Sequence, residues 1–570
     1  MENFNQTIES TKMYISKLIL NTDESIEVNS DDIIVFVGPN NVGKSKALND
    51  IKVLCGVEND TQYRDVVIVK DIDVKKEGMS NIKQFVLDSR YGVEVGNQIN
   101  IAGNNYSENQ IQKNINNKYY GILSNIFVMH ITAGYIHYAN AANNNNMGMM
   151  SNTEPIHFLN EIKEYRLKAS EGFRKAFGKD LLPHRMKGES IPLCIGDEAE
   201  LDKKTCGKSG NDSLDAYKEV MDKMPQIQNQ SDGIKSFTST LVNLVIKTRQ
   251  TYLLDEPETF LHPPQAYIMG RLIGELLDQR QAFISTHSQD IIKGLLEVCP
   301  QRVKIVRITR DNNINYFKVL DNSKIRELWK DTLLRYSDML NGLFHENVVL
   351  CESDSDCKLY SIILENIKEE HGYYSQTQFI QSNGKQRISK MVVALRDLGI
   401  NVFSVVDIDI FSNEYDLRKL IESYGDDWSK YKEKYNLLIA NLNSNVTHID
   451  RSEIKEKIDD IIKSSNKKEL SKEEVNKITK ALSYTSKWGI IKKSGIHALP
   501  TGDGYNAYMQ IEKMLKEKGI FVVNVGELEN FIKSVGGHGP EWVSKVLEEY
   551  KDINGTIYDE IRNFVKSWGI

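Results

Sequence analysis

The chain has 570 residues, of which 40% are hydrophobic and 26% are charged, a composition typical of soluble globular proteins. This length exceeds what one hydrophobic core serves and predicts two or three domains. No run of about 18 apolar residues occurs, and the N-terminus lacks the regions of a signal peptide, so we expect a cytoplasmic protein without membrane contact. The net charge of −7 excludes a broadly basic nucleic-acid-binding coat but permits local basic grooves.

A phosphate-binding motif lies in the segment DDIIVFVGPNNVGKSKAL, which predicts a buried strand over residues 33–37, a tight turn and a helix. Gly38 and Gly43 allow the backbone amides of the turn to point at phosphates. Lys44 supplies a charge to the β- and γ-phosphates, and Ser45 is the expected Mg²⁺ ligand. The predicted ATP-binding residues of this turn are Gly38, Asn40, Asn41, Gly43, Lys44 and Ser45.

Two further apolar strands supply the other residues expected of an ATPase. QTYLLDEPETFLHPPQ predicts a strand that ends in Asp255, the Mg²⁺-orienting carboxylate, and Glu256, which polarises the attacking water. About thirty residues later, AFISTHSQDII predicts a strand followed by His287, a candidate sensor of the γ-phosphate. A histidine at a strand end is more often an ordinary turn residue, but its spacing from the DEP strand favours the sensor.

The order of these motifs resembles the ATPase head of the ABC/SMC-like class. In that class a signature loop upstream of the second strand completes the ATP site of a second head. The matching segment here is QSDGIKSFTSTLVNL, with Ser231 and Gly233 as the corresponding contacts, although it departs from the usual Ser-Gly-Gly pattern. The resemblance implies a homodimer or a larger homo-oligomer formed through the heads.

Acidic residues end three predicted strands in the last third of the chain. Glu352 follows VVLC, Asp407 and Asp409 follow NVFSVV, and Glu527 and Glu529 follow IFVVNVG. In a parallel sheet these strand ends share one edge, and such a cluster needs cations to offset its repulsion. Oxygen ligands without His or Cys indicate Mg²⁺ or Mn²⁺, and two such ions are an arrangement that cuts phosphodiesters. The alternative for Asp354 and Asp356 is capping of the following helix.

This pattern resembles the Toprim domain, with Glu352 as its first glutamate and Asp407 and Asp409 as its DxD. The spacing of Glu352 and Asp356 is the variant of OLD-family nucleases, which join an ABC-type ATPase head to a C-terminal Toprim domain. The Gabija nuclease subunits and retron-associated OLD effectors share this layout. The resemblance implies metal ligands at Glu352, Asp356, Asp407, Asp409, Glu527 or Glu529. It also implies a lysine at the scissile phosphate, for which Lys545 is the candidate.

The predicted fold is thus α/β: an ABC/SMC-like head over residues 1–335, with an insertion at about 56–230, and a Rossmann-like Toprim domain over 336–570. Residues 414–518 are charged and have helical periodicity, so we expect a solvated helical insertion. Within it, SKWGIIKKSG contains Lys492 and is alternatively a DNA-backbone contact. Lys385 and Arg387 follow a glycine turn and are either phosphate contacts or an exposed turn. The Asn-rich stretch near residue 145 predicts a mobile loop.

The co-occurrence of both motif sets predicts an ATP-regulated, Mg²⁺- or Mn²⁺-dependent DNA endonuclease, the effector of a bacterial antiphage system. An RNA–DNA hybrid from a retron, a helicase companion, or no partner are all compatible. The rival hypothesis is an ATPase switch whose Toprim-like domain binds a nucleic acid or a toxin without cutting, as in PARIS-type systems. Loss of Glu352, Asp407 or Asp409 would favour the rival, yet all three are present. An SMC-like repair ATPase would need long heptad-bearing arms, which are missing.

Overall fold

The structure is a computed structural model that divides into two compact units, residues Met1–Arg335 and Tyr336–Ile570. It describes residues 12–56, 67–77, 83, 86, 92–101, 104–132, 140, 142–143, 155–187, 190–246, 249–311, 314–320, 322–330, 338–372, 376–444, 451–463, 469–483, 487–499 and 501–570. Most of the Asn-rich stretch lies outside these ranges. Among the helices so described, each is too short or too polar to traverse a lipid bilayer.

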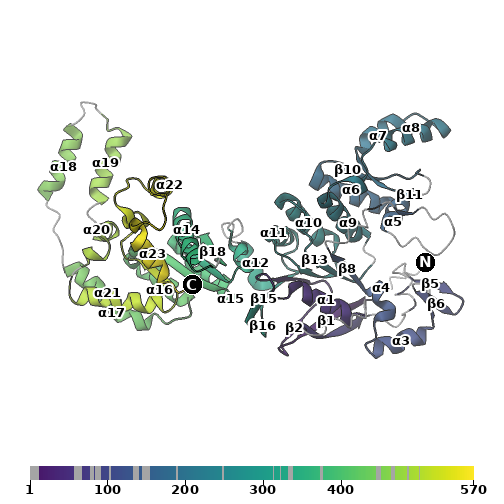
Figure 1. Cartoon of the computed structure of the whole chain (residues 1–570), viewed down its shortest axis with the longest axis horizontal. Helices are drawn as coiled ribbons and strands as arrows, with labels where there is room; N and C mark the ends of the chain where they lie inside the picture. The colour runs from purple at the N-terminus through teal and green to yellow at the C-terminus, as the bar shows by residue number, and fades with distance from the viewer. Residues whose placement is uncertain are drawn as a thin grey trace, which may run out of the picture. The chain divides into compact units, whose positions relative to one another are not determined.

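The first unit is built on a six-stranded sheet in the order β16-β15-β3-β14-β13-β8 (Figure 1). Only the β15–β16 pair is antiparallel. The strands of this sheet are β3 (Ile33–Val37), β8 (Val128–Thr132), β13 (Thr251–Asp255), β14 (Gln281–Ser285), β15 (Val303–Asp311) and β16 (Ile314–Leu320). All five residues of β3 are buried, which explains why its sequence is continuously apolar rather than alternating.

Helix α1 (Lys44–Leu54) packs against β13, β14 and the antiparallel strand β4 (Val69–Glu77). β4 pairs with β1 (Lys12–Leu20), which also pairs with β2 (Ser25–Glu27). Parts of the segment expected as an insertion at about 56–230 therefore belong to the two sheets of the first unit. β4 pairs with β1, and β8 pairs with β13. Val128 and Ile131 of β8 are buried there, and this burial offsets the entropy cost of ordering a strand that lies far from its partner in sequence.

The rest of the first unit is mostly helical. Its other helices are α3 (Glu108–Asn116), α4 (Ser124–Phe127), α5 (Pro155–Glu161), α6 (Lys163–Phe177), α7 (Glu198–Thr205), α8 (Gly210–Asp222), α9 (Asp232–Ile246), α10 (Pro263–Leu276), α11 (Gln289–Val298) and α12 (Asn322–Lys330). Short antiparallel strands complete it: β5 (Gly92–Val95), β6 (Gln98–Ile101), β7 (Asn104–Tyr106), β9 (Ala142–Asn143), β10 (Asp180–Pro183), β11 (Ser190–Ile191) and β12 (Leu193–Gly196).

The second unit contains a four-stranded, fully parallel sheet in the order β18-β17-β19-β20. Its strands are β17 (Asn347–Cys351), β18 (Thr377–Gln381), β19 (Asn401–Asp407) and β20 (Ile520–Val523). Helices α14 (Asp354–Glu370), α22 (Gly539–Glu549) and α23 (Asp559–Lys566) share one hydrophobic core with β17, β19 and β20, and this core includes the fully buried Trp542. α15 (Lys385–Asp397) packs on β19.

The expected helical insertion leaves the sheet after β19 and returns at β20 (Figure 1). It comprises α16 (Glu414–Ser423), α17 (Ser429–Ser444), α18 (Arg451–Lys463), α19 (Lys472–Ser483), α20 (Lys487–Ser494) and α21 (Asp503–Lys516). α17 packs on α21, and α18 packs on α19. The α/β class with this insertion is as the sequence predicted.

Candidate active site

The predicted phosphate-binding turn joins β3 to α1 and is shaped by its glycines. Gly38 has φ +142°, and a Cβ there would lie 2.1 Å from the backbone oxygen of Ile308, so both conformation and space require glycine. The Lys44 ammonium donates to the backbone oxygens of Gly38 (2.9 Å) and Pro39 (2.7 Å) across the turn. Burial lowers the pKa of Lys44 to about 8, although neighbouring carboxylates raise it.

The two asparagines of this turn, Asn40 and Asn41, are exposed, and Asn41 has φ +62°. Gly43 is the N-cap of α1, with φ +99°. The N-terminus of α1 therefore faces the turn with its unpaired amides and positive dipole end, which suits an anion.

Asp255, at the end of β13, connects two of the predicted strands to the start of α1. Its Oδ1 accepts a hydrogen bond from the Ser45 hydroxyl (2.8 Å) and another from Ser285 at the end of β14. Since β13 and β14 are parallel neighbours with Asp255 opposite Ser285, the sheet register alone places these groups together. Ser45 and Asp255 are thus adjacent, as a shared Mg²⁺ ligand set requires.

Glu256 and His287 face each other beyond these strands. His287 Nε2 lies 3.6 Å from Glu256 Oε1, and Glu256 has φ +49°, a left-handed conformation uncommon outside glycine. Burial, and next the charge of Lys44, lower the pKa of His287, which favours a neutral imidazole.

Glu258, which the sequence reasoning did not single out, fixes the turn that carries His287. Its Oε1 accepts hydrogen bonds from the Thr286 hydroxyl (2.8 Å) and from the His287 backbone N–H (2.7 Å). Burial raises the pKa of Glu258, although these hydrogen bonds lower it. The acidic residue two positions after Glu256 is the sequence signal that could have pointed to it.

The signature-like residues lie at the start of α9. Ser231 precedes the helix and its backbone oxygen accepts from Lys235 N (3.1 Å). Gly233 approaches Phe260, which is 61% exposed: a Cβ on Gly233 would lie 2.5 Å from the Phe260 backbone oxygen. Ser231 and Gly233 therefore lie beside the segment that follows Glu256.

In the second unit, the carboxyl ends of β17 and β19 bring three predicted carboxylates together. Glu352, Asp407 and Asp409 each offer an oxygen, and these oxygens lie within 4.8 Å of one another. Glu352 Oε1 also accepts a hydrogen bond from the Asp407 backbone N–H (3.1 Å), which ties the two strand ends together. Asp409 lies in the 3₁₀ turn η5 (Ile408–Ser412) directly after β19.

Burial dominates the electrostatics of these carboxylates. It raises the pKa of Glu352, which Asp409 raises further, and it raises the pKa of Asp407 well above its usual range together with the charge of Glu352. Ionised forms here are therefore unfavourable unless a cation is close.

Two lysines lie against this cluster. Lys492, on α20 of the insertion, lies 2.9 Å from Asp407 Oδ2, 3.6 Å from Asp409 Oδ2 and 3.9 Å from Glu527 Oε2. Burial lowers the pKa of Lys492, but Asp407 and Asp409 outweigh it and the net pKa is raised. Lys385, at the start of α15, lies 3.2 Å from Asp409 Oδ1. We refer to Glu352, Asp407, Asp409, Lys385 and Lys492 as the carboxylate–lysine centre.

Asp356 is engaged in starting α14. Ser353 is the N-cap, and a reciprocal capping box joins the Ser353 hydroxyl to Asp356 N (3.3 Å) and Ser353 N to Asp356 Oδ2 (2.9 Å). Asp354 is in the first turn and pairs with Lys358. Burial raises the pKa of Asp356, and Glu529 raises it further. One oxygen of Asp356 therefore caps α14, as the capping alternative predicts. The charge of Glu529 raises the pKa of the same side chain.

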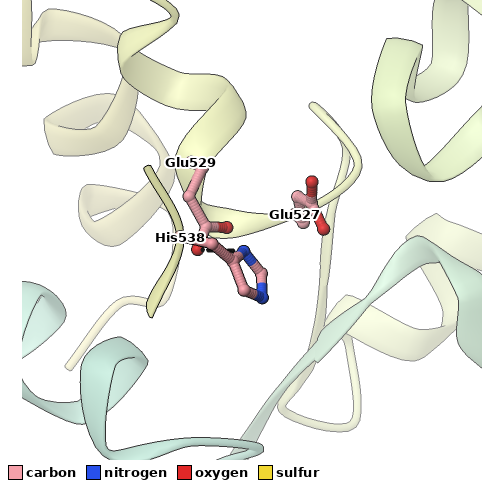
Figure 2. Close-up of side chains that lie close together, drawn as sticks. All are labelled: Glu527, Glu529 and His538. Atoms are coloured by element: carbon pink, nitrogen blue, oxygen red, sulfur yellow. Dashed lines mark ion pairs between the residues drawn. The ribbon is translucent and has the colours of Figure 1, made fainter. Parts of the chain in front are cut away.

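Glu527 and Glu529 follow β20 and form a second acidic group with His538, which the sequence reasoning did not include (Figure 2). Each of the three offers one ligand atom within 4.8 Å of the others. His538 Nδ1 lies 2.7 Å from Glu529 Oε1, which also accepts from the Gly539 backbone N–H (2.7 Å) at the start of α22. Burial raises the pKa of Glu527, as does Glu529.

Lys545, the predicted phosphate-binding lysine, lies elsewhere. It is on the exposed face of α22 and pairs with Glu541 one turn earlier (2.6 Å), a common surface arrangement of small energetic consequence. The lysines with described ion pairs to the strand-end carboxylates are Lys385 and Lys492. The sequence signal for Lys492 is the KK pair in SKWGIIKKSG, which the sequence assigns to a solvated helical insertion, with a DNA-backbone contact as the alternative.

Residues 343–409, which include β17, β19 and the three strand-end carboxylates, match the family model "Overcoming lysogenization defect protein-like, TOPRIM domain". The second unit contains an OLD-like TOPRIM domain. The chain is also 24% identical over 164 residues to Endonuclease GajA from Bacillus cereus (strain VD045). That alignment covers 29% of this chain and 27% of GajA. The predicted resemblance to OLD-family nucleases is thereby confirmed.

Solved structures with low similarity include SMC heads. The SMC head domain from Thermotoga maritima is 14% identical with a TM-score of 0.28, covering 55% of this chain and 99% of that one. The SmcHead bound to the C-winged helix domain of ScpA is 12% identical with a TM-score of 0.35 over the same shares. The predicted α/β class with a TOPRIM domain in the second unit is confirmed by the parallel sheet and the family match, while the ABC/SMC-like head stays a prediction.

Proposed function

We propose that this protein is an ATP-regulated, divalent-metal-dependent DNA endonuclease of the OLD family and the effector of an antiphage defence system. The observation that carries the proposal is the convergence of Glu352, Asp407 and Asp409 at one edge of the TOPRIM sheet. The similarity to the endonuclease GajA supports the reaction, over the 27% of that protein that aligns.

The residues of the centre fit Mg²⁺ or Mn²⁺. Glu352, Asp407 and Asp409 provide only carboxylate oxygens, the ligands that hard divalent cations prefer, and they are largely buried. A bound cation supplies a nucleophilic hydroxide at neutral pH and stabilises charge on the phosphate. Asp356, Glu527 and Glu529 are further acidic groups near these ligands, with His538 beside the last two.

The lysines have a separate role in the proposal. The Lys492 side chain is about a third exposed, and its ammonium presents a positive charge toward the phosphate of a bound strand. Lys385 holds Asp409 in place by donating to the backbone oxygen and to Oδ1 of Asp409. Such preorganised charges stabilise a developing negative charge without reorganisation of water.

The first unit is the proposed ATP sensor. Gly38, Asn40, Asn41, Gly43 and Lys44 surround the phosphates, while Ser45 and Asp255 hold Mg²⁺. Glu256 orients the attacking water, and His287 contacts the γ-phosphate. Ser231 and Gly233 contact the nucleotide of a second head, so the protein works as a homodimer or larger homo-oligomer.

The test is plasmid cleavage by the purified chain in Mg²⁺ or Mn²⁺, with and without ATP, beside Asp407→Asn. Asp407→Asn keeps the size of the side chain and removes a ligand charge, so we expect cleavage to be lost while ATP binding persists. The ATP comparison gives the sign of the regulation. Cleavage by Asp407→Asn at the wild-type rate would refute the assignment of the centre.

If neither protein cuts, addition of phage-infected lysate tests whether a trigger is required. Binding of a nucleic acid or partner protein without cutting, under every nucleotide condition, would support the switch hypothesis instead.

A further inference from the structure

The β15–β16 hairpin extends beyond the carboxyl end of β3 and lies beside the phosphate-binding turn. β3 ends at Val37, which is paired with Arg307 of β15, and β15 continues from there to Asp311. β16 then returns antiparallel, with Asn315 paired to Arg310 near the end of the hairpin. The hairpin therefore presents its last residues to the turn, although it contains none of the residues predicted to bind ATP.

Asn315 is a polar residue on the buried face of β16. Its side chain is 1% exposed, and the other buried residues of this strand, Phe317 and Leu320, are apolar. A buried amide costs free energy unless it is hydrogen-bonded. Asn315 Nδ2 donates to the Val42 backbone oxygen (2.8 Å), and this hydrogen bond is buried as well. The hairpin is thus attached to the turn at Val42.

This hydrogen bond sets the orientation of the peptide group that joins Val42 to Gly43. The peptide is trans and planar, so its C=O and N–H point in opposite directions. Because Asn315 holds the Val42 oxygen toward the hairpin, the Gly43 N–H is directed away from the hairpin. Gly43 has φ +99° and no Cβ to restrict its backbone. The bond from Asn315 therefore limits a rotation that glycine would otherwise permit.

The first half of the turn is held differently, by the Lys44 ammonium. This ammonium donates to the backbone oxygens of Gly38 and Pro39, and it is also the predicted partner of the β- and γ-phosphates. Its bonds to the turn therefore compete with bound ATP for the same three donors. Asn315 donates to a carbonyl oxygen, which is itself an acceptor and does not bind phosphate. Its hold on Val42 is therefore compatible with a bound nucleotide.

We propose that Asn315 is a positioning residue for ATP: by holding the Val42 oxygen, it directs the Gly43 N–H at the β-phosphate. Without this bond, the peptide can rotate and place an acceptor oxygen where the phosphate needs a donor. This inference rests on the proposed ATP sensor and deepens it, because it assigns the β15–β16 hairpin to the phosphate site.

The experiment measures the binding of fluorescent ATP and ADP analogues to the full chain and to Asn315→Leu, which has a side chain of similar size without a donor. Asn315→Leu should bind both analogues about ten- to hundredfold more weakly than wild type, as expected for a lost hydrogen bond to a charged group. The matched control is Asn243→Leu. Asn243 is also buried and donates to a backbone oxygen, that of Ser239 in α9 (2.8 Å). This control should bind both analogues as wild type does.

Phosphorus NMR at saturating ADP separates positioning from a general effect on the fold. In Asn315→Leu the β-phosphorus resonance of bound ADP should shift, while the α-phosphorus resonance stays as in wild type. A purely structural role would leave both resonances unchanged. If Asn315→Leu fails to fold, as judged by circular dichroism, Asn315→Ala removes the same donor with a smaller side chain and takes its place.

Wild-type affinity in a folded Asn315→Leu or Asn315→Ala, or an unchanged β-phosphorus resonance, would overturn the inference and leave the proposed ATP sensor standing. An equal loss of affinity in Asn243→Leu would also overturn it, because any buried asparagine would then have the same effect. If the wild type binds neither analogue, the proposed ATP sensor itself is wrong.

Discussion

Replacement of Glu258 by alanine tests how the first unit positions His287. Glu258 Oε1 accepts two hydrogen bonds, from the Thr286 hydroxyl and the His287 backbone N–H. Alanine leaves both donors without this acceptor, and an unsatisfied buried donor costs about 1–3 kcal/mol. Because the His287 N–H is near the surface, water compensates part of this loss. We therefore expect the loss of the two hydrogen bonds to Glu258 to cost about 2 kcal/mol.

If this cost adds fully to the activation free energy of ATP hydrolysis, kcat should fall about thirtyfold, because about 1.4 kcal/mol corresponds to a factor of ten in rate. KM should change little, because Glu258 contacts the turn rather than the phosphate-binding residues. Glu258→Gln keeps an oxygen acceptor in the same place and should hydrolyse ATP within about threefold of wild type. The assay is steady-state ATP hydrolysis by the full chain.

The control is thermal unfolding of each variant, which separates loss of the turn from loss of the fold. A folded Glu258→Ala with wild-type kcat would refute the positioning role. Equal losses in Glu258→Ala and Glu258→Gln would show that the charge of Glu258, rather than its hydrogen bonds, is what matters.

Three further predictions follow from the same structure. Gly38→Ala should abolish the binding of a fluorescent ATP analogue, because the new Cβ would clash with the backbone oxygen of Ile308. The control is Gly178→Ala, at a glycine with φ +70° and open space around it. This variant should bind the analogue normally and lose only about 1–2 kcal/mol of stability. Contacts with the ATP phosphates should raise the pKa of Lys44 from about 8, so Lys44 should take up a proton when ATP binds. The affinity for ATP should therefore weaken by up to about tenfold per pH unit above about pH 8. An affinity that calorimetry finds constant between about pH 7 and 9.5 would contradict this. Trp542→Ala should destabilise the second unit by about 3–5 kcal/mol in urea unfolding, because Trp542 is fully buried in its core. A change below about 1 kcal/mol would contradict the contribution of this buried side chain to stability.

The strand ends were predictable from sequence because parallel strands impose a simple rule. Buried strands read as continuous apolar runs, and polar residues directly after them gather at one edge. Asp255, Asp407 and Glu352 all follow such runs, and the structure places each beside its expected neighbours. The fold class followed from the same patterns.

Lys492 was not predictable because its partners are distant in sequence and its own surroundings are ambiguous. Asp407 precedes it by a long helical stretch whose periodicity specifies helices but not their packing. Lys492 and Lys545 both lie on helices within two residues of an apolar side chain, Ile491 and Val543, so the local pattern cannot distinguish a partly buried ion pair from a surface one. Only the contacts of α20 with Asn530 and Gly526 decide between them. Similarly, the local sequence of β8 predicts at most a strand and does not indicate that it pairs with β13, which is distant in the chain.

The packing of α17 on α21 closes the base of the helical insertion before α18 and α19 begin (Figure 1). Because α17 and α21 pack on each other, the loop-closure entropy of the chain that joins them depends only weakly on its length. The hairpin of α18 and α19 is therefore a natural graft point: residues between α17 and α20 can be shortened to a brief linker or exchanged for a reporter domain. Such a chimaera should keep Lys492 beside Asp407 and Asp409 while carrying a fluorescent reporter on the second unit.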